Sequence, residues 1–121
     1  MRKVEDAARE SFGEDSFERG RALNALATCL DSNDESEEAE KVLREAIKIK
    51  AFTSVTEVKQ KLVLSDAYFN LGVVLLKSGK GLEATINFKL SLAVKKECDI
   101  PEDDPSLLEV KEFLQKAEQV K

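Results

Sequence analysis

The chain has 121 residues, of which 42% are hydrophobic and 36% charged, and its formal net charge is −5. These values predict a globular protein with room for one domain and a buried core, and they exclude a disordered chain. The acidic balance, without an arginine-rich or aromatic-interleaved stretch, argues against nucleic acid as a partner.

Apolar residues recur at helical spacing along almost the whole chain, which predicts six helices. The first has Val4, Ala7, Ala8 and Phe12 on one face and ends at Gly13. The fourth begins with a capping box from Ser54 to Glu57, in which two side chains bond to free backbone N–H groups. The predicted helices cover residues 3–12, 17–30, 36–51, 55–78, 82–98 and 106–120.

The predicted fold class is all-α, because no segment shows the two-residue alternation of a strand. Short turns separate the helices, at Asp31–Ser36 and around Gly79. Short turns make neighbouring helices antiparallel, so we expect antiparallel helix pairs. Gly72 lies inside a helix, where glycine is unfavourable, so a neighbouring helix should approach closely there and at Ala27.

The segment 66–93 carries a spaced set of seven residues, and eight residues upstream repeat the pattern. Asp34 takes the place of the turn residue Gly79, and Leu26 lies 45 residues before Leu71. The downstream set is Tyr68, Leu71, Gly72, Leu75, Gly79, Ala84 and Phe88, and the upstream set is Leu23, Leu26, Ala27, Leu30, Ala39, Leu43, Ala46 and Ile47. This pattern resembles the tetratricopeptide repeat (TPR). The resemblance implies an α-solenoid, a right-handed stack of antiparallel helix pairs with two repeats plus terminal helices.

The repeats are longer than the 34 residues of an ordinary TPR, and in this they are similar to those of the kinesin light chain group. The phrases at Phe12–Ala27 and Ile100–Leu108 resemble the way repeats of that group begin. The resemblance implies a single domain over 1–121. Its parts are an N-terminal helix or cap at 1–13, a first repeat at 16–52, a second with an extended first helix at 54–98, and a capping helix at 105–121.

The resemblance also implies a concave groove that binds a peptide or a helix of a partner protein. The groove residues by this resemblance are Asn24, Thr28, Asp66, Phe69, Asn70, Val73, Leu76 and Lys77. Phe69, Val73 and Leu76 form a second apolar stripe, so their helix is either buried on two sides or binds something. A covering of this stripe by the N-terminal or the final helix is the alternative interpretation.

No motif predicts an enzyme, a cofactor, a metal site or a small-molecule substrate. The chain lacks histidine, and its acidic clusters fall in turns and linkers, where a capping or solvated role is expected. Asp31, Asn33 and Glu35 alternate like calcium ligands, but the central glycine and the closing glutamate are missing.

Two isolated cysteines, Cys29 and Cys98, favour a reducing compartment, and we expect a cytoplasmic protein. The longest apolar run, Val73–Leu76, is too short to enter a membrane. The net charge is −7 over residues 1–40, +5 over 41–100 and −3 over 101–121. The simpler interpretation of the basic middle is a set of solvated charges on helix surfaces, and the alternative is a positive strip that draws an acidic peptide.

The sequence therefore predicts an adaptor or scaffold that binds another protein. The alternative is a structural fragment or subunit of a larger repeat array, whose groove is filled by its own chain.

Overall fold

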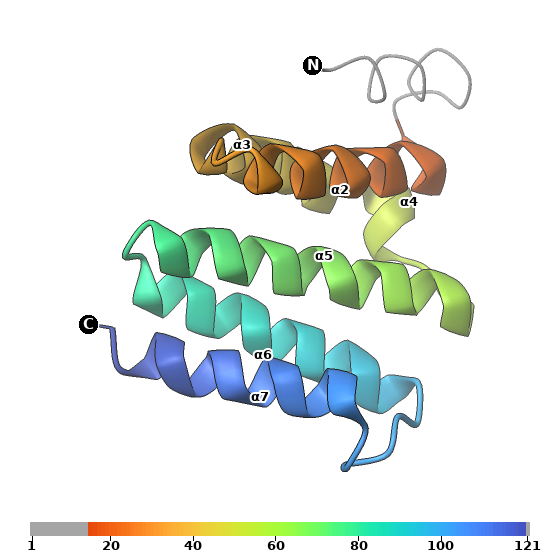
Figure 1. Cartoon of the computed structure of the whole chain (residues 1–121). Coiled ribbons are helices and arrows are strands. Elements are labelled where there is room, and N and C mark those ends of the chain that lie inside the picture. The colour runs from red at the N-terminus through yellow and green to blue at the C-terminus, as the bar shows by residue number, and fades with distance from the viewer. Residues whose placement is uncertain (1–14, 121) are drawn as a thin grey trace. The chain divides into compact units, whose positions relative to one another are not determined.

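The computed structural model describes residues 15–120, and this part of the chain is all-helical, with six helices and no strand. The chain divides into two compact units, Met1–Thr56 and Glu57–Lys121. The first unit holds α2 (Phe17–Ser32), α3 (Ser36–Lys48) and α4 (Lys50–Thr53), and the second holds α5 (Val58–Lys77), α6 (Gly81–Glu97) and α7 (Pro105–Glu118) (Figure 1). The all-α prediction is confirmed for these residues. The predicted helix at 3–12 lies outside them.

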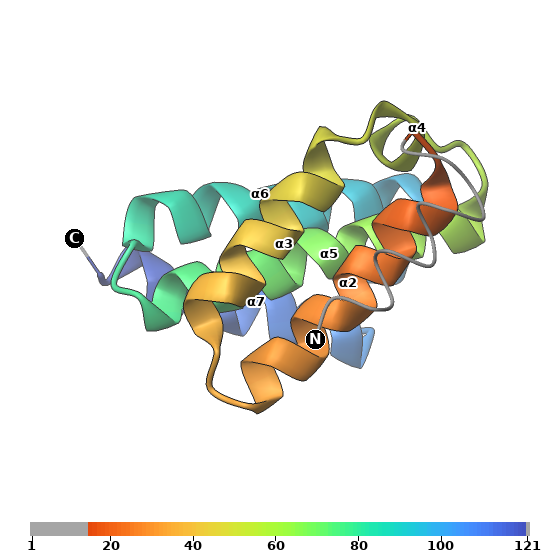
Figure 2. The ribbon, with the colours of Figure 1, turned by 90° about the horizontal axis from the view of Figure 1, so that it is seen from above.

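In the first unit, α2 and α3 form an antiparallel pair, visible from above in Figure 2. Ser16 begins α2 by accepting a hydrogen bond from the Arg19 backbone N–H at 3.1 Å. Small residues then allow close packing, because a Cβ on Gly20 would collide with the ring of Phe52 in α4. Phe52 is fully buried, so this contact fixes α4 against α2.

The sequence analysis was wrong in extending α3 to residue 51. Ile49 has extended backbone angles (φ −77°, ψ 110°) and ends α3, and α4 begins at the next residue. The break turns the buried side chains of Ile49 and Phe52 into the core. The Ala51 backbone N–H donates to the Asp15 carboxylate at 3.0 Å, so a side chain satisfies one of the amides that the break exposes.

The predicted capping box from Ser54 to Glu57 is also wrong. Ser54 ends α4, and its N–H donates to the Lys50 carbonyl at 2.9 Å. Helix α5 begins only at Val58, after Glu57, whose side chain makes no capping bond. Ser54, which was expected to start one helix, therefore closes the helix before it, and only Glu57 directly precedes α5.

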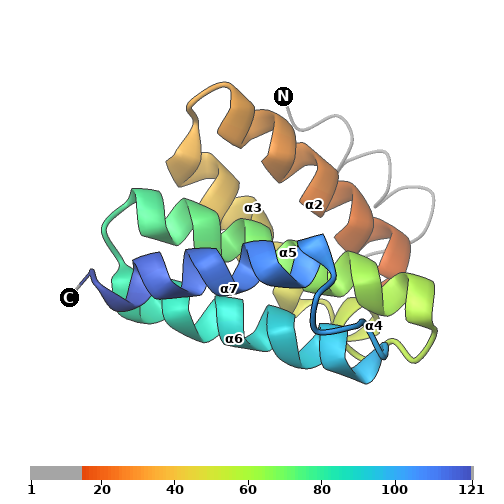
Figure 3. The same ribbon diagram turned by 60° about the horizontal axis from the view of Figure 1, so that its bottom comes forward.

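In the second unit, α5 and α6 are antiparallel, and α7 runs alongside α6 (Figure 3). A Cβ on Gly72 would lie 2.6 Å from the ring of Phe88, which is fully buried. The close approach predicted at Gly72 is confirmed. Two buried serines join the same helices, because the Ser65 and Ser91 hydroxyls lie 2.8 Å apart and each also bonds to the other residue's carbonyl.

The two helix pairs repeat each other at an offset of 45 residues. Helices α2 and α5 end at Ser32 and Lys77, and α3 and α6 begin at Ser36 and Gly81. Both turns use the same left-handed residue, Asp34 (φ 61°) in one and Gly79 (φ 77°) in the other. Each left-handed residue donates to the carbonyl three residues before it, and the next residue to the carbonyl five before, as in the Schellman motif. The turn and the two helix ends beside it therefore recur at this offset, whereas the outer ends do not, because α2 begins at Phe17 and α5 at Val58.

Candidate protein-binding surface

The predicted groove residues lie on two helices, one in each unit. Asn24 and Thr28 are on α2, where Asn24 is 6% exposed and Thr28 is exposed. The Thr28 hydroxyl donates to the Asn24 carbonyl at 3.2 Å, which satisfies one donor within the helix. The other six residues are all on α5. Of these, Asp66 and Lys77 are exposed, and the other four are half-buried: Phe69, Asn70, Val73 and Leu76.

Phe69 is part of a three-ring cluster in the second unit. Its ring centroid lies 5.3 Å from that of Phe113 on α7, in an edge-to-face arrangement, and 5.7 Å from that of Phe88 on α6. The Phe88 and Phe113 centroids are 5.9 Å apart. At Phe69, then, the final helix covers the predicted stripe. Whether Val73 and Leu76 contact a partner stays a prediction.

A different apolar stripe lies on α6, and the sequence analysis missed it. Leu82, Ile86 and Leu90 are 77%, 57% and 41% exposed, although the opposite side of α6 is fully buried at Ala84, Phe88 and Ser91. Residues four apart lie above one another on a helix, so these three side chains form a continuous strip. We call Leu82, Ile86 and Leu90 the α6 stripe.

The equivalent positions of the first helix pair are charged. Counting back 45 residues from the α6 stripe leads to Glu37, Lys41 and Glu45 on α3. Helix α3 thus has one apolar side and one polar side, as expected for a helix that faces solvent. The exposed leucines and isoleucine are therefore specific to α6, because α3 packs in an equivalent helix pair with charged residues at these positions. This difference between the repeats is the signal that could have identified the α6 stripe from sequence.

A mostly apolar cavity of about 480 Å³ adjoins the α6 stripe at its N-terminal end. It is lined by Leu82 and Thr85 of α6 together with Ala117, Glu118 and Val120. The end of the chain comes close here, because a Cβ on Gly81 would lie 2.8 Å from the Val120 Cβ. Leu82 belongs to both the cavity and the stripe, so the two form one continuous surface.

Charges at the far end of α6 are largely engaged within the second unit. Lys61 of α5 bonds to Glu97 at 2.7 Å, and this bond raises the pKa of the lysine. Lys111 bonds to Glu102 at 2.7 Å and, with a smaller effect from Lys96, lowers the pKa of that carboxyl group. Lys89 is different. It is exposed and forms no ion pair within residues 15–120.

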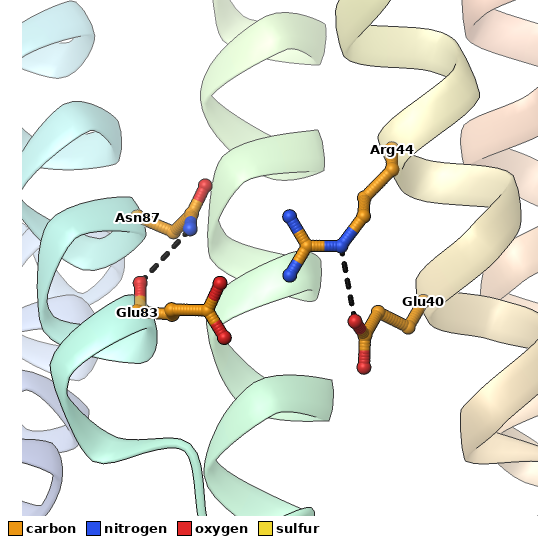
Figure 4. A network of polar contacts seen from close by, with 4 residues as sticks. All are labelled: Glu40, Arg44, Glu83 and Asn87. Atoms are coloured by element: carbon orange, nitrogen blue, oxygen red, sulfur yellow. Dashed lines mark hydrogen bonds and ion pairs between the residues drawn. The ribbon is translucent and has the colours of Figure 1, made fainter.

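Other polar contacts lie within one helix or join neighbouring helices of one unit. Figure 4 shows two examples, each within one helix: the Arg44–Glu40 ion pair at 3.0 Å, and the Asn87 amide donating to the Glu83 carbonyl at 2.9 Å. A cavity of about 400 Å³ in the first unit contains Arg19, but its guanidinium already bonds to Glu45 at 3.2 Å. This pair joins α2 to α3.

No three His, Cys, Asp or Glu residues among those described lie together in a way that could hold a metal ion. Cys29 and Cys98 are free thiols. Burial raises the pKa of Tyr68, which is half-buried. None of the described helices has the length and apolar composition needed to cross a membrane.

Comparison with known protein families, curated proteins and solved structures found no match to this chain.

Proposed function

We propose that this chain is a non-enzymatic protein-interaction module built from TPR-like helix pairs, which acts as an adaptor or scaffold. The observation that carries the proposal is the α6 stripe. Its three side chains are exposed, whereas the equivalent positions of α3 are Glu37, Lys41 and Glu45. An apolar strip on a helix whose other side is already packed is typical of a protein-binding surface.

The repeat itself supports the TPR-like part of the proposal. The 45-residue offset is kept by the helix ends beside the turns and by the left-handed turn residues, and small residues lie at the helix contacts of both units. Repeat proteins of this kind stack helix pairs and use the resulting surfaces for binding. The free thiols of Cys29 and Cys98 suit a reducing compartment, in agreement with a cytoplasmic location.

A structural role is the second candidate, and the aromatic cluster favours it. Phe113 of α7 lies edge-to-face on Phe69, so part of the predicted groove on α5 is filled by the chain's own final helix. In this alternative the protein is a subunit of a larger array, and its exposed faces meet neighbouring helices of that array.

The proposal is tested by selecting peptides from a displayed library, rich in both helical and extended segments, against the full chain. The key variant carries Leu82→Glu, Ile86→Lys and Leu90→Glu, which copies the α3 pattern onto α6. Because α3 folds with these residues, the variant should keep its helical circular dichroism. We expect selected peptides to bind the wild-type chain and to lose binding to this variant.

A second variant, Val73→Ser with Leu76→Ser, probes the predicted groove on α5. Binding that is lost only in this variant would keep the interaction function and move its site to α5. A library that yields no specific peptide at all would contradict the proposed function.

A further inference from the structure

We propose that the ion pair between Lys61 and Glu97 is a salt-sensitive latch, which closes the open end of the second helix pair and lets that end open when the pair is screened. The open end is the end of α5 and α6 away from the turn at Gly79, where α5 begins at Val58 and α6 ends at Glu97. We call Lys61 and Glu97 the ion-pair latch. This inference concerns the motion of the second unit and does not rest on the proposed function.

The corresponding end of the first helix pair is closed by an aromatic side chain. Forty-five residues before Glu97 stands Phe52, which is fully buried. Its ring occupies the space where Gly20 lacks a side chain, and its centroid lies 5.5 Å from that of the Phe17 ring. The first unit therefore holds this end by apolar burial, which salt does not screen, and the second unit has a charged residue in the same place.

Buried side chains give the open end of the second pair little support. Helix α5 begins four residues before the point that the 45-residue offset from α2 would give. Its first buried residue is Leu64, and the last buried residue of α6 is Val94. Residues 58–63 and 95–98 are all exposed or half-buried. Helix ends with few buried contacts open at a lower free energy than the core, so the contacts made there decide how often they open.

A strong and a weak polar contact join these two helix ends. The Lys61 ammonium donates to the Glu97 carboxylate at 2.7 Å, whereas the Cys98 sulfur lies 4.0 Å from the Val58 carbonyl oxygen, which makes a much weaker bond. The side chains of the ion-pair latch are 23% and 56% exposed, so dissolved ions reach the pair and screen it. An exposed pair of this kind changes an opening equilibrium by about two- to fivefold.

Each charge of the latch is unfavourable for the helix that carries it. Lys61 is in the first turn of α5, near the positive end of the helix dipole, and Glu97 is the last residue of α6, near the negative end. The attraction between the two side chains offsets this cost only while the ends are closed. Screening of the pair therefore leaves two helix ends that are held less firmly, and we expect both to open together.

The test measures amide hydrogen exchange of the full chain by NMR in about 0.1 M and about 1 M sodium chloride, between which the Debye length falls from about 10 Å to about 3 Å. Two matched amides are compared. The Lys61 N–H donates to the Glu57 carbonyl at 2.9 Å, and the Gly20 N–H donates to the Ser16 carbonyl at 3.3 Å. Each belongs to the fourth residue of its helix. After correction for intrinsic exchange rates, we expect high salt to speed exchange about two- to fivefold at Lys61 and to leave Gly20 unchanged.

A neutral variant shows whether the ion pair causes the salt effect, with the Cys98 amide at the end of α6 as the readout. This N–H donates to the Lys95 carbonyl at 3.0 Å. Lys61→Met should speed exchange there about two- to fivefold at low salt and remove the salt effect. The matched control is Lys59→Met. Lys59 is exposed in the same turn of α5 and forms no ion pair within the described residues, so its loss should not speed exchange at Cys98.

Exchanging the two charges separates the ion pair from a loss of local packing. Lys61→Glu and Glu97→Lys each place like charges together and should speed exchange at Cys98. The chain with both changes should be protected at least as well as the wild type, because the pair is restored and each charge then suits its helix dipole. Equal salt effects at Lys61 and Gly20, or a salt effect that persists in Lys61→Met, would overturn the proposal. A double variant that exchanges as fast as the two single variants would also overturn it.

Discussion

Replacing Gly72 by alanine tests the close approach of α5 and α6. A Cβ at this position would lie 2.6, 2.7 and 2.9 Å from three ring atoms of Phe88. The ring is fully buried and is confined by the rings of Phe69 and Phe113, so it has little room to move. Overpacking of this kind costs about 1–3 kcal/mol. Alanine gains about 1 kcal/mol over glycine inside a helix. The net expectation is a loss of up to about 2 kcal/mol in the free energy of unfolding.

Tyr68 offers a direct assay for this change. It is the only tyrosine, the chain has no tryptophan, and it lies on α5 one turn before Gly72. Its fluorescence during urea denaturation therefore reports on the helix that carries the substitution. The slope of the transition with urea and its midpoint give the free energy of unfolding.

A double-mutant cycle separates the clash from helix propensity. In a chain with Phe88→Leu, which removes the ring, Gly72→Ala should be neutral or stabilising by up to about 1 kcal/mol. Ala93→Gly, at an exposed position on α6, measures the propensity effect alone. The reasoning is refuted if Gly72→Ala stabilises the wild-type chain as much as it stabilises the Phe88→Leu chain.

Three further predictions follow from contacts within the second unit. Ser65→Ala should lower the free energy of unfolding by about 1 kcal/mol, because it removes the buried Ser65 hydroxyl together with its hydrogen bonds to Ser91. An unchanged urea midpoint would contradict this. Phe69→Ala and Phe113→Ala should be coupled by about 0.5–1.5 kcal/mol in a thermodynamic cycle, and strictly additive effects would mean that the rings do not touch. Hydrogen bonds from the Ser106 hydroxyl and backbone N–H hold the pKa of Asp104 below its ordinary value of 3.8. The ionised Asp104 carboxylate therefore stabilises the folded chain above pH 3.8, and this stabilisation is lost as the pH falls through the lowered pKa. The difference in melting temperature between the wild-type chain and Asp104→Asn should therefore shrink from neutral pH to about pH 2.5, and a constant difference would be evidence against it.

Much of the backbone could be predicted from sequence, because its signals are local. The turn at Asp34 and the turn at Gly79 follow from residues that tolerate a left-handed conformation. The glycine at position 72 is unfavourable inside a helix, and this alone indicates the close helix contact that Phe88 makes there. The break at Ile49 could not be predicted in this way, because it depends on the packing of Phe52 against Gly20, a contact between distant parts of the sequence.

The candidate surface was harder to predict, because apolar periodicity does not tell a packed face from an exposed one. Phe69 and Ile86 each belong to a helix with two apolar sides. The structure shows that Phe69 packs on Phe113, whereas Ile86 is 57% exposed. The distinction depends on which side chains α7 covers, and this contact between separate helices is not visible in the apolar pattern of α5 or α6. Only the comparison of α6 with α3, position by position, would have pointed to Ile86 from sequence.

Methyl NMR of the full chain, titrated with a peptide selected from the displayed library, is the most direct test of the α6 stripe as a binding surface. The account predicts that the methyl resonances of Leu82, Ile86 and Leu90 shift together with saturable binding, and that those of Leu108 stay in place. Shifts confined to Val73 and Leu76, with the α6 methyl groups unchanged, would contradict it.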